Sequence, residues 1–133
     1  MEAGAGGAQD AAGKENCVLI MFRRPPYGSV MAVEGFRMAE ALLAFQVPLK
    51  VVFAEDGVLN LLKGQGNGPL GMGDLGKAFA GLHSSGLPEL LVVRDDLDAR
   101  KLSPADLVDA PVTLVSACHL RKLMEESRVV IPF

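Results

Sequence analysis

The two cysteines are the side chains of this protein best suited to covalent chemistry. Cys118 is predicted to lie in the first turn of a helix that begins at Ser116, and the N-terminus of a helix stabilises a thiolate. His119 is its neighbour, but adjacent helical residues do not face each other, so the two do not form a ready catalytic pair. Cysteine is also among the most frequently buried residue types. Cys118 is therefore a candidate catalytic thiol. The alternative is a structural role, which the tendency of cysteine to be buried favours. Cys17, at the start of a strand, is expected to be inert.

A second candidate site is the turn RRPPYGS at residues 23–29, which follows an apolar run predicted to be the first strand. Ligands of parallel sheets bind at the carboxyl ends of the strands, and the N-terminus of the next helix attracts anions. The two arginines could hold an anion there, although solvated charges at a strand end are the more common interpretation. Ser29 is predicted to cap the following helix. The candidate ligand-binding residues are Arg23, Arg24, Tyr27, Gly28 and Ser29, together with Asp56 from the end of the next strand.

Two adjacent carboxylates, Glu55 and Asp56, follow the second predicted strand. Such a pair can act as a general acid and base or as metal ligands. No histidine or third ligand lies nearby in the sequence, so the favoured interpretation is that Asp56 caps a short helix at 58–63. We therefore predict neither a metal site nor a bound cofactor.

The segment QGNGPLGMG at 65–73 contains two overlapping matches to the pattern GxGxxG. A dinucleotide site needs that pattern directly after a strand, whereas here it follows a predicted helix. No GK[ST] sequence completes a phosphate-binding loop. We therefore interpret the segment as a mobile rim or a partner-contact loop.

Apolar runs and helical periodicity predict the elements that position these residues. Strands are expected at 17–22, 49–54, 89–93, 112–115 and 129–133, and helices at 29–46, 58–63, 74–83, 103–109 and from 116 onward. Because strands alternate with helices, we predict an α/β fold, a three-layer sandwich with a mainly parallel five-stranded sheet in a flavodoxin-like arrangement. The small, polar residues 1–16 are expected to form a disordered tail, and residues 17–133 a single domain.

The first and last helices differ in their patterns. The helix at 29–46 carries only Glu34, Arg37 and Glu40 as charged residues, on one narrow stripe, so a second apolar face could pack on another subunit. The last helix is expected to bury one stripe, and a final strand at or near a sheet edge follows it. That stripe consists of Leu120, Leu123 and Met124.

Composition excludes several classes of function. The chain of 133 residues has a net charge of −3 without a basic face, so direct nucleic-acid binding is not expected. No apolar run approaches the roughly 20 residues that span a bilayer, and no signal peptide is recognisable, so no membrane association is expected. Two distant cysteines without a CxxC spacing do not make a disulfide framework. These features predict a cytoplasmic protein.

Four segments carry a resemblance to a known family. The turn PPYGS, the helix EGFRMAEALLAF, the segment VVFAEDGVLNLLKGQ and the end SRVVIPF are similar to the DsrE/DsrF (TusC) family of sulfur-relay subunits. The spacing from DGV through LL to GQ is the most specific part, and the match is good over 17–65 and looser beyond. The resemblance implies the same fold and a habit of forming dimers, trimers or heterohexamers.

The sulfur-transferring members of that family present a cysteine near the end of the third strand. At the corresponding place this chain has Arg94 and Asp95, and no cysteine lies between Val18 and Ala117. In this respect the chain resembles the DsrF/TusC branch. The resemblance implies a non-catalytic subunit of a cytoplasmic DsrEFH- or TusBCD-like assembly, serving tRNA thiolation or sulfur oxidation. Its partners would be DsrE-family subunits, in a homo- or hetero-oligomer, and a sulfur-carrier protein.

Two other functions stay open. One is a stand-alone persulfide carrier that uses Cys118, which would need that thiol exposed at the carboxyl edge of the sheet. The other is a small anion- or nucleotide-binding module that uses the turn at 23–29.

Overall fold

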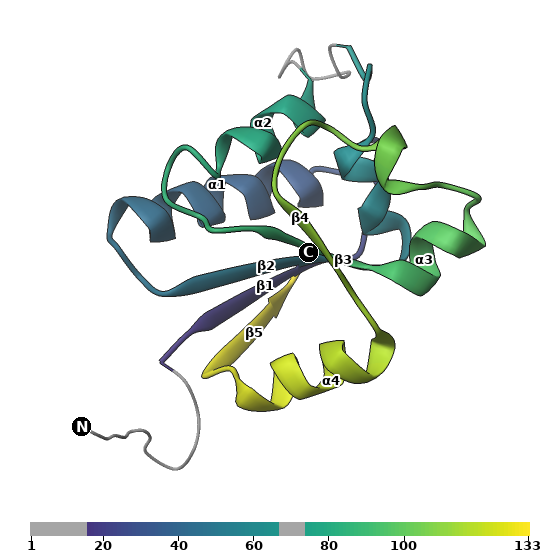
Figure 1. The fold of residues 1–133 in the computed structure, drawn as a ribbon. Helices are drawn as coiled ribbons and strands as arrows, with labels where there is room; N and C mark the ends of the chain where they lie inside the picture. The colour runs from purple at the N-terminus through teal and green to yellow at the C-terminus, as the bar shows by residue number, and fades with distance from the viewer. Residues whose placement is uncertain (1–15, 67–73) are drawn as a thin grey trace.

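The computed structural model describes residues 16–66 and 74–133, and within them five parallel strands form one sheet (Figure 1). The strands are β1 (Val18–Phe22), β2 (Leu49–Phe53), β3 (Leu90–Val93), β4 (Val112–Val115) and β5 (Val129–Pro132). Their order across the sheet is β4-β3-β2-β1-β5. The final strand is therefore an edge strand, as expected, and the predicted parallel five-stranded α/β fold is confirmed.

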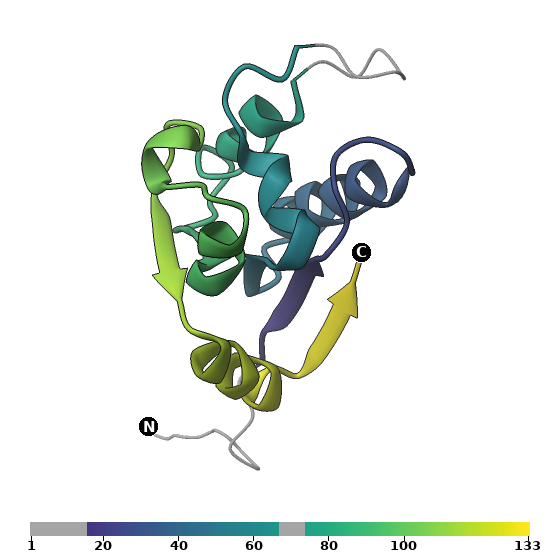
Figure 2. The same ribbon diagram turned by 90° about the vertical axis from the view of Figure 1, so that its right-hand side faces the viewer.

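Four α-helices and two 3₁₀ helices connect the strands in the described part of the chain. They are α1 (Met31–Ala44), η2 (Glu55–Leu61), α2 (Leu75–Gly81), α3 (Arg94–Ala99), η3 (Pro104–Asp106) and α4 (Ala117–Glu126). Helices α1 and α2 cover one face of the sheet and α4 covers the other (Figures 1 and 2). This arrangement is the predicted three-layer sandwich. None of the described helices is long and apolar enough to cross a membrane.

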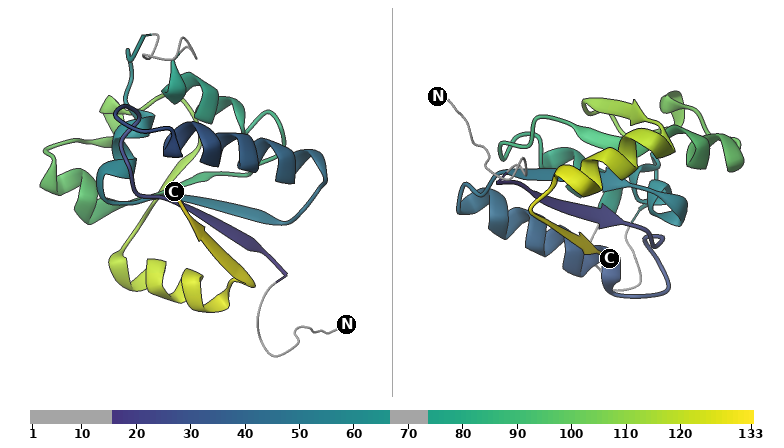
Figure 3. Two further views of the ribbon diagram at one scale, coloured as in Figure 1. Left: turned by 180° about the vertical axis from the view of Figure 1, so that it is seen from behind. Right: turned by 90° about the horizontal axis from the view of Figure 1, so that it is seen from below.

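The two faces of the sheet carry cores of unequal size. Successive strand residues point to opposite faces, so Ile20 and Phe22 join the larger core under α1 and α2, whereas Leu19 and Met21 join the smaller one. Buried aromatic rings gather in the larger core. In the smaller core Leu123 is the buried residue that α4 contributes, and Figure 3 shows α4 nearest the viewer when the molecule is seen from below.

Several local features match the sequence-based expectations. Asp74 caps α2 by accepting a hydrogen bond from the Lys77 amide, and Ser116 caps α4 by accepting one from the His119 amide. Ser103 and Asp106 form the expected start of a helix, although that helix is the single turn η3. The Gly-rich segment at 65–73 and the expected tail at 1–16 lie mostly outside the described residues.

Other expectations are wrong. Residues 94–99 form α3, a helix that periodicity did not reveal because Leu97 is its one buried residue. Helix α1 begins one residue after Val30, and the Ser29 hydroxyl only accepts a hydrogen bond from the Met31 amide at 3.3 Å. Met124 is exposed, because a single helix over this face of the sheet buries a narrow stripe.

The tightest approach between two elements lies where η2 crosses the carboxyl end of β1. A Cβ atom on Gly57 would lie 1.8 Å from the carbonyl oxygen of Phe22. That same oxygen accepts a hydrogen bond from the Ala54 amide at 2.9 Å. Moving it away from a side chain at position 57 would break this backbone hydrogen bond. Only glycine therefore fits at position 57.

We predict that Gly57→Ala destabilises the fold by at least about 2 kcal/mol, because the added methyl group overlaps backbone atoms. Urea unfolding followed by circular dichroism measures the change. Gly81→Ala is the matched control, since nothing lies within 4 Å of a Cβ there, and we expect it to be neutral or stabilising by up to about 1 kcal/mol. Equal effects of the two substitutions would contradict the packing argument.

Candidate functional site

The carboxyl ends of the parallel strands bring the predicted site residues to one edge of the sheet. Arg23, Arg94 and Ser116 directly follow β1, β3 and β4, and Glu55 is the second residue after β2. Because β1 and β2 are neighbours in the sheet, Arg23 and Glu55 meet. We call this end of the molecule the carboxyl edge.

Arg23 forms a two-pronged ion pair with Glu55. Its Nε donates to Glu55 Oε2 at 2.8 Å and its Nη2 donates to Oε1 at 3.4 Å, and both side chains are about half exposed. The hydrogen bond to the Glu55 carboxylate, together with its charge, raises the pKa of Arg23 above the usual value. The charge of Arg23 is thus balanced within the edge, which weakens it as an anion ligand.

Helix α3 and the residue that follows it hold the two acidic residues after β2. Asp96 accepts a hydrogen bond from the backbone amide of Glu55 at 2.8 Å, which fixes Glu55 at a left-handed φ of 54°. Arg100 donates to Asp56 Oδ1 through Nη2 at 2.8 Å and through Nε at 3.1 Å. It also donates through Nη1 to the carbonyl of Asp96 at 2.9 Å. Charged pairs therefore run from β1 through β2 to α3.

The prediction that Asp56 caps the helix after β2 is wrong. The cap position of η2 is Ala54, and no side chain caps that end. Asp56 pairs instead with Arg100, which lies 44 residues away, directly after a helix that the sequence did not reveal. Sequence patterns depend on residues that are close along the chain, so they could not predict that Arg100 pairs with Asp56.

The turn at 23–29 is held by the segment that follows β2. Asn60 is fully buried, and its Nδ2 donates to the carbonyls of Arg24 at 2.8 Å and Gly57 at 2.9 Å. The Tyr27 hydroxyl donates to the carbonyl of Gln65 at 3.1 Å. Sequence reasoning missed Asn60, although a lone polar residue within the run VLNLL was the available signal.

Gln65 closes the same segment. Its Nε2 donates to the carbonyls of Asn60 at 2.8 Å and Leu62 at 3.0 Å, which satisfies acceptors at the end of η2. The spacing DGV–LL–GQ is therefore explained by packing: Gly57 passes the carbonyl of Phe22, Val58 and Leu61 enter the core, and Gln65 ends the turn.

A shallow cavity of about 390 Å³ lies at the carboxyl ends of β1 and β5. Its lining residues are Arg23, Arg24, Met31, Glu55, Pro132 and Phe133. Of the candidate ligand-binding residues, only the two arginines line it, and the structure places Tyr27, Gly28, Ser29 and Asp56 outside. Arg24 is exposed, and its side chain makes no ion pair with residues 16–66 or 74–133.

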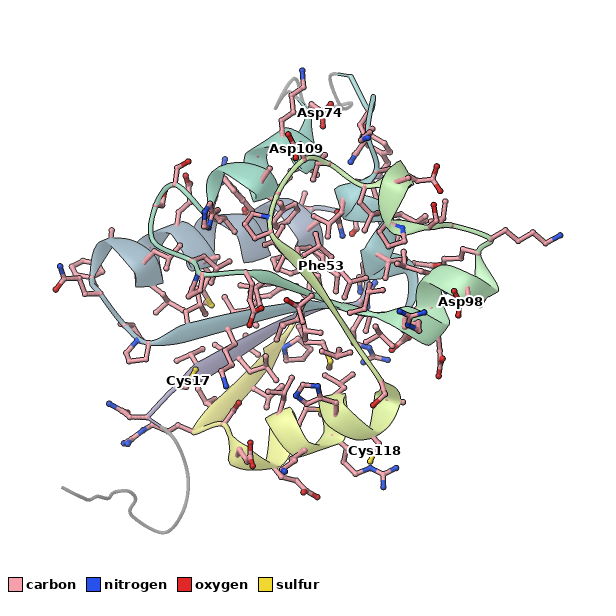
Figure 4. The ribbon with its side chains drawn as sticks, in the orientation of Figure 1. Cys17, Phe53, Asp74, Asp98, Asp109 and Cys118 are labelled. Atoms are coloured by element: carbon pink, nitrogen blue, oxygen red, sulfur yellow. The ribbon has the colours of Figure 1, made fainter. Side chains whose placement is uncertain are left out.

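Cys118 is exposed, so the burial tendency that favoured a structural role does not apply to it. It lies in the first turn of α4 on the side away from the small core, because Leu123 is the residue that points inward. Cys17 is buried at the amino end of β1, at the far end of the sheet from Cys118 (Figure 4). The two thiols therefore lie in different surroundings, and Cys118 is the one that a reagent can reach.

No group of three or more metal-binding side chains is found among the described residues.

The comparison with known proteins identifies the family. The sequence model of the DsrE/DsrF-like family matches residues 17–133. This protein belongs to the DsrE/DsrF-like family. It is 30% identical over 128 residues to the intracellular sulfur oxidation protein DsrF of Allochromatium vinosum, and the match covers 86% of this chain and 94% of that protein.

Two solved structures share the fold of this DsrE/DsrF-like chain. The ychN protein from E. coli superposes with a TM-score of 0.77 at 21% identity, covering 90% of this chain and 100% of that one. The protein MTH1491 from Methanobacterium thermoautotrophicum superposes with a TM-score of 0.63 at 15% identity, covering 89% and 100%. Both similarities confirm the α/β architecture and say nothing further about activity.

The family resemblance predicts where a sulfur-carrying cysteine would lie, at the carboxyl end of β3. In this chain that place is the first turn of α3 and carries charged residues. Arg94 and Asp95 are exposed in the first turn of α3, and Asp96 is engaged with Glu55. No cysteine occurs in the sequence between Val18 and Ala117. The described part of this edge therefore has one thiol, that of Cys118 after β4.

We predict that Asn60→Ala lowers the free energy of unfolding by about 1–3 kcal/mol, because two carbonyls lose their donor. Hydrogen–deuterium exchange should also quicken in residues 23–29. Asn16→Ala is the control, since Asn16 is exposed and accepts one long hydrogen bond of 3.4 Å, and we expect a change within about 0.5 kcal/mol. Unchanged exchange at 23–29 in Asn60→Ala would show that this residue does not hold the turn.

Proposed function

We propose that this protein is a non-catalytic subunit of a cytoplasmic sulfur-relay assembly of the DsrEFH or TusBCD kind. The proposal rests on one observation at the carboxyl end of β3. Arg94 and Asp95 occupy the place where a sulfur-carrying cysteine would lie. The 30% identity to an intracellular sulfur oxidation protein supports sulfur oxidation over tRNA thiolation as its pathway.

The charge pairing at the carboxyl edge supports a scaffolding role. Arg23 is paired with Glu55 and Arg100 with Asp56, so these groups hold the ends of β1 and β2 in place. Groups that neutralise each other in the resting protein are poorly suited to acid–base chemistry. The subunit would instead shape the surroundings of a thiol that a DsrE-family partner subunit supplies.

A stand-alone persulfide carrier is the alternative that the exposure of Cys118 favours. In that reaction the Cys118 thiolate attacks the outer sulfur of a donor persulfide, the sulfur–sulfur bond of the donor breaks, and the donor leaves as a thiolate. Cys118 then carries the persulfide, and no external oxidant or reductant is needed.

One experiment separates these two functions. We would mix the protein with a cysteine-bearing DsrE-family subunit that has been loaded with persulfide sulfur. Native mass spectrometry is expected to show a complex, and the denatured mass of this chain is expected to show no added sulfur. Cys118→Ser is the control that tells sulfur on Cys118 from sulfur elsewhere. Sulfur on Cys118 would overturn the non-catalytic proposal in favour of the carrier, and the absence of a complex would overturn the subunit proposal.

The cavity between β1 and β5 favours a third candidate, an anion-binding module. We expect this candidate to fail, because Glu55 neutralises Arg23, and Arg24 is then the one charged side chain without an ion pair among the described residues of the lining. Inorganic phosphate and a nucleoside diphosphate should therefore not raise the melting temperature of the wild type beyond the effect of ionic strength. A rise that Arg24→Ala abolishes and Arg94→Ala retains would establish the module, since Arg94 is exposed at the same edge but does not line the cavity.

A further inference from the structure

The cavity at the carboxyl ends of β1 and β5 has two adjacent arginines in its lining, Arg23 and Arg24. Both are exposed, and Glu55 is the acidic residue that lines the same cavity. Glu55 pairs with Arg23, whereas the Arg24 side chain makes no ion pair with residues 16–66 or 74–133. The charged side chains of the lining therefore have two positive charges and one negative charge.

The backbone presents both arginines rigidly. The Arg23 amide donates to the carbonyl of Phe133 at 2.7 Å, which ties it to the residue after β5. The carbonyl of Arg24 accepts a hydrogen bond at 2.8 Å from the side chain of Asn60, which is fully buried. Pro25 follows Arg24, and its ring fixes its own φ. Two cations held in this way lose little backbone freedom when they bind a ligand.

Glu55 occupies the position that an anion would take on Arg23. Its two carboxylate oxygens accept from Nε and Nη2, the two-pronged geometry with which arginine binds carboxylates and phosphates. The left-handed φ of 54° is a strained conformation for a residue other than glycine. The Glu55 side chain is 54% exposed, and exposed ion pairs contribute little to stability. An anion of higher charge can therefore displace this carboxylate.

A hydrogen bond from α3 keeps Glu55 in this conformation. Asp96 Oδ2 accepts from the Glu55 amide at 2.8 Å, and its other oxygen lies 3.9 Å from Nη1 of Arg100. Asp96 does not line the cavity. It therefore acts on the site through the backbone of Glu55 and links the end of β1 to α3.

We propose that this cavity is a binding site for a small, doubly charged oxyanion, which Glu55 closes in the resting protein and Asp96 keeps closed. Two arginines match two negative charges, whereas the carboxylate of Glu55 supplies one. A tethered carboxylate competes with a free anion at an effective concentration of about millimolar or more, so the wild type excludes dilute anions. This inference rests on the cavity of the anion-binding candidate above and adds the residue that excludes the anion.

Calorimetric titration of the full chain with inorganic sulfate at constant ionic strength tests the closure. Glu55→Gln removes the competing charge and should lower the dissociation constant of sulfate at least about fivefold relative to the wild type. Asp56→Asn is the matched control. It removes the same charge from the neighbouring residue and frees Arg100, which does not line the cavity, so the constant should change by less than about twofold.

Two further pairs of variants test the arginine and the role of Asp96. The gain in Glu55→Gln should be lost on adding Arg24→Ala and kept on adding Arg94→Ala, because Arg94 is exposed at the same edge but outside the lining. With Glu55 present, Asp96→Ala should strengthen sulfate binding. Asp96→Asn, which makes the same change in charge but keeps an acceptor for the Glu55 amide, should behave as the wild type.

Circular dichroism of each variant checks that it is folded. Sulfate binding that Glu55→Gln does not strengthen, or that Asp56→Asn strengthens equally, would overturn the site. A wild type that binds sulfate as tightly as Glu55→Gln would overturn the closure and establish the open module instead. Equal binding by Asp96→Ala and Asp96→Asn would overturn the role of Asp96. These measurements involve neither sulfur transfer nor a partner subunit, so their failure leaves the proposed relay subunit standing.

Discussion

The contact between Gly57 and the carbonyl of Phe22 is the constraint on which the carboxyl edge depends. It brings η2 against the end of β1 so closely that no side chain can intervene. The Phe22 ring anchors the same point from within, stacked on Phe53 at 5.0 Å and meeting Phe79 edge to face at 4.8 Å. Phe22 therefore contacts the sheet, η2 and α2 at once. Because this packing fixes the end of β1 against η2, it also determines where Arg23 and Glu55 lie.

The two ends of the sheet differ in physical character. At the carboxyl edge, oppositely charged side chains from β1, β2 and α3 satisfy one another, which gives a polar surface with a fixed shape. At the amino end a cavity has a mostly apolar lining that also includes Lys50 and Glu89, and the exposed Phe45 lies outside that lining. Exposed ion pairs contribute little to stability, so the value of the carboxyl network lies in the geometry that it imposes.

The chain belongs to the DsrE/DsrF-like family, and one relative, 30% identical to it, is an intracellular sulfur oxidation protein. The end of β3 lacks a thiol, and the exposed thiol of the described chain lies one strand further out, after β4. Arg94 and Cys118 follow neighbouring strands, but α3 buries Leu97 in the larger core and α4 buries Leu123 in the smaller one, so the two helices pack on opposite faces of the sheet.

The sequence by itself determined the elements that depend on neighbouring residues. Apolar runs specified the five strands, and local side-chain hydrogen bonds at Asp74 and Ser116 specified helix starts, because both signals act over a few residues. The tertiary structure alone decided the ion pair between Asp56 and Arg100, the burial of Asn60 against the turn, and the exposure of Cys118. These depend on which segments pack together across the sheet, and a pattern that repeats every two or four residues carries no information about partners more than thirty residues away.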